Sequence, residues 1–224
     1  MNYMKNKTIF LSLIIFYSTI VTAQVPVSKE PRHHNILQNK YVRVLDVWVS
    51  PGDTTLFHIH STPSVFVILS NTYTGSQIMG EGWGEKNQSV AGNAWYRSFI
   101  HDTLIHRVAN FDTISFHVND IEILSSYNNN SSNKKRLPYT LLFENEKASA
   151  YQLKSGYIKN QLIKDRGPMI AVLITGERLF YYDTVLKKRT ELKAGKYLYI
   201  EPGAAFYFTD NGSKELNMVL FEIK

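Results

Sequence analysis

The stretch PGDTTLFHIHSTPSVFVIL, residues 51–69, contains the features that decide both the fold and the site. Within it, His58 and His60 stand one residue apart, between a Pro-Gly turn and an apolar run. Residues i and i+2 of a β-strand point to the same face, so the two imidazoles share a face and Ile59 points away. In a barrel this face can be the interior, where both imidazoles can reach one divalent ion at about 2.0–2.1 Å. Two imidazoles alone hold an ion weakly, so the pattern predicts a third ligand elsewhere.

The rest of the chain predicts an all-β protein. Short runs of β-branched and aromatic residues alternate with Gly, Pro, Asn and Asp, and no segment keeps a helical period over three turns. The runs expected to form strands are YVRVLDVWV (41–49), VFVIL (65–69), TISFHV (113–118), MIAVLI (169–174), KYLYI (196–200) and LNMVLFEI (216–223). Many short strands at this spacing are typical of a sandwich or a barrel.

The candidate for the third ligand is His106, which begins the run HRVANFDTISF (106–116). A neighbouring strand can bring this histidine beside His58 and His60. Together the three residues would form an all-imidazole site. The alternative is that they are ordinary polar residues on exposed strand faces.

Residues 1–23 have the pattern of a secretory signal. Lys5 and Lys7 precede an apolar core that runs to about Ile20, and small or short residues occupy the expected cleavage site at Val21-Thr22-Ala23. A membrane anchor is the alternative, but the apolar run is short for a span and no charged stop-transfer patch follows. We therefore expect a secreted or periplasmic protein, of bacterial type, without membrane association after cleavage.

The composition excludes several classes of protein. The chain has no cysteine, so disulfides, thiolate zinc sites and lipid attachment through a cysteine are excluded. The formal charge of +6 falls to +4 once Lys5 and Lys7 are removed, and the remaining charges are interspersed. The basic cluster Lys134-Lys135-Arg136 lies in a polar tract, so we expect no nucleic-acid partner.

A polar, low-complexity tract divides the mature chain almost in half. The segment SSYNNNSSNKKR, residues 125–136, has no means of packing and predicts a linker. The predicted domains are a first barrel over 24–124, which carries the metal-site motif, and a second barrel over 137–224. After removal of the leader, 201 residues remain, which is enough for two β domains of about 90–100 residues.

The two halves align as an internal repeat with an offset of 104 residues. At this offset the positions Gly52, His58, His60 and Ser64 correspond to Gly156, Leu162, Lys164 and Pro168. With two residues dropped, His106 faces Tyr207 and Asn110 faces Asn211. A repeat of about 100 residues implies two similar β-barrels. The second has kept the frame and lost the histidines, so we interpret it as structural, with a metal-free anion pocket at Lys164 and Tyr207 as the alternative.

The spacing of these residues is similar to that of a known family. Gly52 is followed by five residues, His58-Ile59-His60, three residues and Ser64; later come Gly92, His101, Thr103, His106 and Asn110. Over residues 36–223 the chain resembles the cupins, whose first motif is Gly, five residues, His-x-His, three or four residues and Glu. Their second motif ends in Pro-x-Gly, two residues, His, three residues and Asn. With a repeated frame, the chain looks like a two-domain cupin, or bicupin.

The resemblance implies two tandem cupin-type (RmlC-like jelly-roll) β-barrels, the second one degenerate. It also implies a metal site of His58, His60 and His106 without a carboxylate, because Ser64 stands where the family has its glutamate. Thiol and gentisate dioxygenases of this family are similar in using three histidines. Three neutral ligands leave an ion its full charge and open positions for water, dioxygen or a chelating substrate. One divalent transition metal is expected, and Fe, Mn, Ni, Cu and Zn all suit imidazole ligands.

Ser64, His101 and Asn110 are the candidates for residues that surround the ligands. His101 stands in a turn before His106, where it could support the site. Asn110 is better interpreted as a structural turn residue than as a substrate contact, because Asn tolerates the left-handed conformation that such turns need.

Three further histidines are less closely tied to the site. His33 and His34 precede the first core strand and could fold over the barrel mouth, or could simply be surface residues. His117 is better interpreted as a strand-face residue than as a fourth ligand. In the Gly-rich loop of residues 80–88, Glu81 or Glu85 could swing over the pocket, although a solvated turn is the simpler interpretation.

The first functional hypothesis is an exported metal-binding bicupin, a mononuclear-metal oxidoreductase of the dioxygenase kind that acts on a small chelating substrate. The alternative is a non-catalytic module that binds a small molecule, a sugar or a metal, which the missing glutamate favours. A cupin-type sugar epimerase would need an acid–base pair, and His58 or His60 with Tyr207 cannot provide one from different barrels. The expected partner is a small-molecule ligand or substrate, and a homodimer is left open.

Overall fold

The computed structural model describes residues 24–127, 135–156, 158, 160–210, 212 and 215–224. The predicted leader over 1–23 and most of the predicted linker lie outside the described residues, so both stay predictions. The described chain is nearly all β, with 18 strands and one short 3-10 helix, η1 (Val27–Lys29), which confirms the all-β prediction. Among these residues no helix has the length and apolar character needed to cross a membrane.

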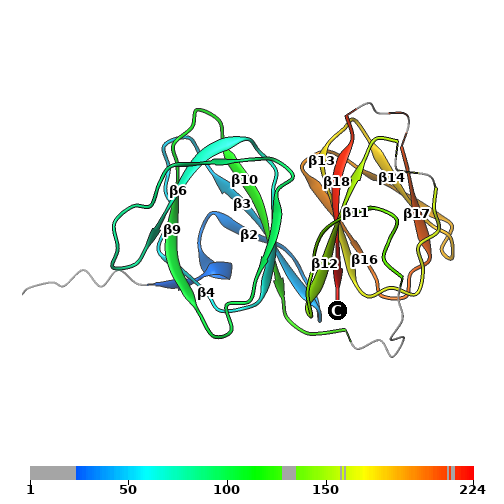
Figure 1. Cartoon of the computed structure of the whole chain (residues 1–224), viewed down its shortest axis with the longest axis horizontal. Coiled ribbons are helices and arrows are strands. Elements are labelled where there is room, and N and C mark those ends of the chain that lie inside the picture. Colours follow the sequence, from blue (N-terminus) through cyan, green and yellow to red (C-terminus); the bar gives the residue numbers. More distant parts are fainter. Residues whose placement is uncertain (1–23, 128–134, 157, 159, 211, 213–214) are drawn as a thin grey trace, which may run out of the picture.

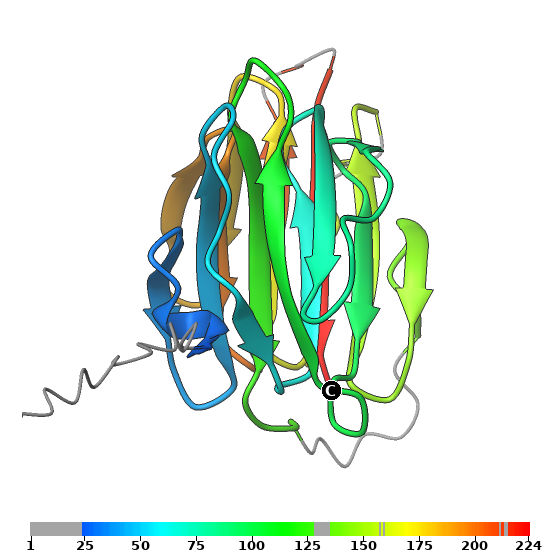
Figure 2. The same ribbon diagram turned by 90° about the vertical axis from the view of Figure 1, so that its left-hand side faces the viewer.

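The first ten strands form two five-stranded sheets that face each other across the first barrel (Figure 1). Sheet A contains, in spatial order, β1 (Val25–Pro26), β4 (His58–His60), β9 (Leu104–Asn110), β6 (Thr72–Ile78) and β7 (Asn87–Ser89). Sheet B contains β2 (His33–Gln38), β3 (Val42–Val49), β10 (Phe116–Ile123), β5 (Ser64–Ile68) and β8 (Ala94–Arg97). In Figure 2 this barrel faces the viewer.

The remaining strands form the second barrel, which lies beside the first (Figure 1). Sheet C contains β11 (Thr140–Glu144), β12 (Ala148–Lys154), β18 (Asn217–Ile223), β13 (Met169–Thr175) and β16 (Lys196–Ile200). Sheet D contains β15 (Lys188–Leu192), β14 (Leu179–Asp183) and β17 (Phe206–Asp210). The order of the strands within each sheet differs from their order in the chain, so many neighbours are joined by crossovers.

The six runs predicted as strands all contribute to strands of the structure. The prediction for β16, residues 196–200, matches its observed bounds. The largest difference is at β10, which begins at Phe116 and continues to Ile123, beyond the predicted end at residue 118. Asp120 and Glu122 interrupt the apolar pattern there, but both are buried inside the barrel, 1% and 3% exposed.

The two barrels share a hydrophobic core between sheets B and C. On β10, Phe116 and Val118 pack inside the first barrel, whereas Ile121 and Ile123 point toward the second. The shared core consists of Val42, Val44, Val65, Val67, Ile121 and Ile123 from sheet B, and Ala148, Ala150, Ile170, Val172, Ile174, Val219, Phe221 and Ile223 from sheet C. Sheet B is therefore apolar on both faces, and the wall behind the site is supported by the second barrel.

In the second barrel, side chains fill the position that corresponds to the histidine site. Ile163 pairs with Phe206 by backbone hydrogen bonds, as His58 pairs with His106 in the first barrel. Ile163 and Phe206 are 3% and 1% exposed and belong to a core that also contains Phe208. Aromatic and aliphatic side chains therefore occupy the space that is a cavity in the first barrel.

The ungapped alignment of the two halves is wrong by one residue at this point. Leu162 is 51% exposed, Lys164 is exposed and Tyr207 is half-buried against Tyr182 on the outer side. These three residues therefore do not stand where the ligands stand in the first barrel, and Lys164 and Tyr207 do not line an internal anion pocket. The apolar Leu162 next to Ile163 hid the register, because a shift of one residue exchanges the two faces of a strand.

Candidate metal centre

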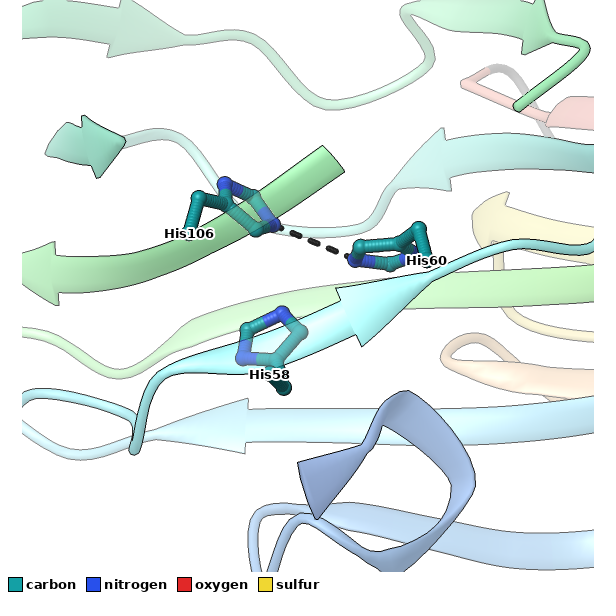
Figure 3. A group of neighbouring side chains, drawn as sticks. All are labelled: His58, His60 and His106. Atoms are coloured by element: carbon teal, nitrogen blue, oxygen red, sulfur yellow. Dashed lines mark hydrogen bonds between the residues drawn. The ribbon is translucent and has the colours of Figure 1, made fainter. Parts of the chain in front are cut away.

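The three predicted ligands come together on two neighbouring strands of sheet A. His58 and His60 lie on β4 and His106 on β9, and the antiparallel register places His58 opposite His106. His58 and His60 are 1% and 4% exposed, and His106 is half-buried. One ring nitrogen from each histidine lies within 4.8 Å of the other two. Figure 3 shows the three rings grouped around one space.

Hydrogen bonds to Nδ1 fix the rings of two of these histidines. His58 Nδ1 donates to the carbonyl oxygen of Leu56 at 2.8 Å, which leaves its Nε2 free. His106 Nδ1 lies 2.9 Å from the hydroxyl oxygen of Ser76. A partner on one ring nitrogen sets the tautomer and orients the other nitrogen for a metal. Both rings are therefore prepared to present Nε2.

The spacing between His60 and His106 fits an ion between them. Their Nε2 atoms are 3.1 Å apart, a contact that is favourable only with a proton or a cation between the two lone pairs. Two nitrogens at about 2.0–2.1 Å from one ion, with about 90–110° between them, are about 2.8–3.4 Å apart. The donor set, its burial and this spacing therefore fit a divalent transition ion.

Burial lowers the pKa of all three imidazoles from the ordinary value of 6.5. The pKa of His58 falls to about 4, that of His60 to about 2 and that of His106 to about 3. The second cause is the positive charge that a neighbouring histidine would carry, which repels protonation. At neutral pH the three rings are neutral, which is the form that binds metals.

A carboxyl group stands near the site, but on a different strand from Ser64. Asp120 of β10 is 1% exposed, lines the same cavity, and has Oδ2 at 3.5 Å from His60 Nδ1. Both Asp120 oxygens and His60 Nδ1 lack a hydrogen bond of good geometry. Ser64 is fully buried beside this carboxyl, but its hydroxyl donates to the carbonyl oxygen of Thr62 at 3.2 Å. Burial and the nearby Glu122 raise the pKa of Asp120 well above its ordinary value, which favours the neutral carboxyl in this contact.

The histidines line a cavity of about 250 Å³ inside the first barrel. Its sheet B wall is mostly apolar and includes Phe66, whose ring stacks on Trp95 with the centroids 4.9 Å apart. Thr74 and Ser89 add hydroxyl groups, and the exposed Glu85 of the Gly-rich loop reaches the cavity wall. Since an apolar cavity of about 150 Å³ can hold benzene, this space suits a molecule of about one substituted ring.

Two of the predicted supporting residues lie away from the cavity. His101 is exposed between β8 and β9 and does not line the cavity, contrary to expectation. Asn110 is fully buried at the end of β9, where its side-chain amide donates to the carbonyl oxygens of Val49 and Ile114. Asn110 therefore has a structural role, although its φ is not in the left-handed region that the sequence suggested.

His117 points away from the site, toward the second barrel. Its ring stacks on Trp48 with the centroids 3.7 Å apart, and its Nε2 lies 2.6 Å from Asp46 Oδ1. His33, by contrast, is buried and lines the cavity, whereas His34 beside it is exposed. Successive side chains of a strand point to opposite faces, so His33 faces the cavity and His34 faces solvent.

Sequence reasoning missed Asp120 and Phe99. Phe99 has a φ of 56°, is 3% exposed, and stacks on His60 with the ring centroids 4.9 Å apart. A left-handed φ strains a bulky residue, so the packing against the ligand must outweigh this strain. No sequence signal marks Phe99. For Asp120 the signal was an acidic residue at an inward-facing position of FHVNDIEI (116–123).

Comparison with known proteins gives matches by structure only. No family model and no curated protein matches the sequence. The structure of AerE from Microcystis aeruginosa matches with a TM-score of 0.58 and 12% identity, over 87% of this chain and 98% of that one. A cupin 2 conserved barrel domain protein from Leptotrichia buccalis matches with a TM-score of 0.52 and 11% identity, over 85% and 88%. A salicylate 1,2-dioxygenase from Pseudaminobacter salicylatoxidans matches with a TM-score of 0.54 and 8% identity, over 82% and 71%.

These matches extend across both barrels and define the fold. The chain has the two-barrel jelly-roll architecture of the cupins, as its motifs suggested. At these identities the likeness concerns the fold alone. The function must therefore be argued from the residues of the cavity.

Proposed function

We propose that this chain is an exported mononuclear metal protein, a dioxygenase-like oxidoreductase that acts on a small chelating substrate. Nε2 of His58, His60 and His106 would hold one divalent transition ion. The observation that carries the proposal is the convergence of three neutral imidazoles at the wall of an internal cavity. The open positions that three neutral ligands would leave on the ion suit the reaction class, and the leader pattern supports a secreted or periplasmic location.

The bound ion would supply a Lewis acid with its full +2 charge and open positions, because none of its protein ligands is anionic. The residues of the chain orient and enclose the site. Leu56 and Ser76 hold Nδ1 of His58 and His106, so that Nε2 of each ring would be left to bind the ion. The apolar wall around Phe66 excludes water from the body of a bound molecule, which strengthens polar interactions near the histidines.

Metal content of the mature protein, purified without a His-tag, tests the proposal. We expect about one equivalent of a transition metal in the parent, and its loss in the His58→Ala/His106→Ala double variant. Circular dichroism must show that the variant is still folded. If the parent holds no metal even after reloading, the metal site and the oxidoreductase function are both excluded.

Oxygen uptake separates an enzyme from a binding module. The parent, loaded with Fe(II) under anaerobic conditions, is mixed with air-saturated buffer and with phenolic, thiol and diketone compounds. Uptake that depends on one of these compounds, and is absent in the double variant, supports the oxidoreductase.

The second candidate is a non-catalytic ligand-binding module, which the serine at position 64 and the packed side chains of the second barrel favour. Ligand binding that survives complete metal removal would support this alternative.

A further inference from the structure

A fourth histidine reaches the cavity from the segment that precedes the first long strand. His33 begins β2, is 8% exposed and lines the cavity. Its ring centroid lies 4.7 Å from that of His58, with the rings tilted by 58°. The N-terminal segment thus contributes to the wall of the site, next to one of the candidate ligands.

The orientation of His33 is fixed by a buried carboxylate. Its Nδ1 lies 2.6 Å from Glu30 Oε2, and the Glu30 side chain is fully buried. Glu30 also accepts hydrogen bonds from the backbone N–H groups of Arg32 and Leu56, at 2.7 Å and 3.0 Å. A carboxylate held by this many donors accepts the Nδ1 proton of the imidazole. Nε2 of His33 is then its free polar atom, and it forms no hydrogen bond with the described residues.

His33 is placed beside the metal position rather than within the ligand set. Among the described residues, the group of side chains that could hold one metal ion consists of His58, His60 and His106, and His33 does not belong to it. An imidazole that lines the cavity and has one nitrogen already committed can accept a hydrogen bond at the other nitrogen from a molecule bound there. Because Nδ1 carries the proton, Nε2 is an acceptor, and its partner would be a hydroxyl group of the bound molecule.

We propose that His33, positioned by Glu30, is a binding residue whose Nε2 accepts a hydrogen bond from a hydroxyl group of the chelating ligand. The inference rests on the proposed metal site and adds a group that the three-histidine motif does not contain. His33 would bind the ligand and not the ion, so its removal should weaken ligand binding and leave metal binding unchanged.

The test uses the full mature chain loaded with Co(II), and 4-nitrocatechol as a chelating probe whose visible spectrum changes on binding. The variants are His33→Leu, which removes the hydrogen bond, and His33→Gln, whose amide can reach the Nε2 position. The exposed His34→Leu is the matched control, since it removes the adjacent imidazole. The affinities for Co(II) and for the probe are measured separately in each protein.

We expect His33→Leu to bind the probe at least about tenfold more weakly, with an unchanged Co(II) affinity, because one hydrogen bond at a buried site is lost. His33→Gln should recover part of the loss, and His34→Leu should match the parent. Equal probe affinity in the parent and His33→Leu overturns the inference, as does a parent that binds Co(II) but not the probe. A large loss of Co(II) affinity in His33→Leu also overturns it, because His33 would then be a ligand. A parent that does not bind Co(II) overturns the proposed function as well.

Discussion

Asp120 places a carboxyl group behind a ligand rather than among the ligands. Its Oδ2 faces His60 Nδ1 at 3.5 Å, while His60 Nε2 faces His106. A carboxylate behind a metal-bound imidazole commonly fixes the ring and raises its basicity. A cation on Nε2 would favour the ionised form of Asp120, so the metal-free carboxyl is held in a position that suits the loaded site.

We therefore predict that Asp120→Ala weakens Co(II) binding by about 10–100-fold, the usual effect of removing such a partner. Asp120→Asn should retain more of the affinity, because its amide oxygen can still accept a hydrogen bond from His60. Titration of the metal-free proteins with Co(II), followed by absorbance, measures the difference. Equal affinities in all three proteins would show that Asp120 does not act through His60.

The low pKa values of the ligands predict how metal binding depends on pH. The three folded-state values, about 4, 2 and 3, lie below the ordinary 6.5. Protons therefore compete with the ion only well below neutral pH. We expect the Co(II) affinity to be nearly constant from about pH 8 to pH 6 and to fall as the pH approaches about 4. A steep loss of affinity near pH 6.5 would show that the rings titrate as if they were exposed.

Glu30 gives a prediction for stability against pH. Its burial alone would raise its pKa, but hydrogen bonds from His33 and from the backbone of Leu56 and Arg32 outweigh this and lower the pKa from 4.5 to about 2. The folded value is below the unfolded one, so this stabilisation is present above pH 4.5 and is lost as the pH falls toward 2.

We expect Glu30→Gln to lower the free energy of unfolding of the metal-free protein by on the order of 2–3 kcal/mol at neutral pH. The difference from the parent should shrink between pH 4.5 and about 2, where Glu30 itself becomes protonated. Urea unfolding at several pH values measures it. A difference that does not change with pH would mean that Glu30 acts by packing and not by its charge.

At the scale of elements, the sequence predicted the strand that carries His58 and His60 for a clear physical reason. The period of two in His58-Ile59-His60 places both imidazoles on one face, and the structure has that alternation, with Ile59 less buried than its neighbours. The pairing of β4 with β9 could be expected only from the spacing of the motifs, because strand partners far apart in sequence leave no local signal.

The N-terminal segment was the least predictable element. β1 pairs in parallel with β4, so that Val25 lies opposite His58, and η1 leads from there to Glu30 and His33. These elements are too short to give a periodic pattern. The burial of Glu30 depends on donors from the loop before β4, which a reading of residues 24–38 alone does not reveal.

The register of the second barrel could not be read from the sequence for a related reason. Its strands are apolar or aromatic at consecutive positions, as in Phe206-Tyr207-Phe208, so hydropathy does not show which face is inside. In the first barrel the polar ligands mark the inner face. In the second barrel only packing distinguishes Ile163 from Leu162.

At the scale of the whole molecule, the shared core predicts that the two barrels unfold together. All three tryptophans, Trp48, Trp83 and Trp95, lie in the first barrel, so tryptophan fluorescence reports on that half. Phe221 is a fully buried residue of sheet C within the shared core, and Phe208 lies inside the second barrel. Truncation of a buried Phe to Ala costs about 3–5 kcal/mol.

We expect both Phe221→Ala and Phe208→Ala to shift the tryptophan-detected urea midpoint downward, in a single transition that coincides with loss of far-ultraviolet circular dichroism. The shift for Phe208→Ala is the stricter test, because this residue belongs to the core of the other barrel. An unchanged tryptophan transition in Phe208→Ala, with a separate transition in circular dichroism, would show that the barrels unfold independently.

The apolar contact between sheets B and C also has a consequence for inheritance. A domain without a functional site is ordinarily free to accumulate substitutions. Here Val172, Val219 and Phe221 of the second barrel pack against Val65 and Ile121, on the strands that form the wall of the cavity. Selection that maintains the site of the first barrel would therefore also act on the second. A recombination event that separated the two barrels would leave an apolar sheet face exposed on each product.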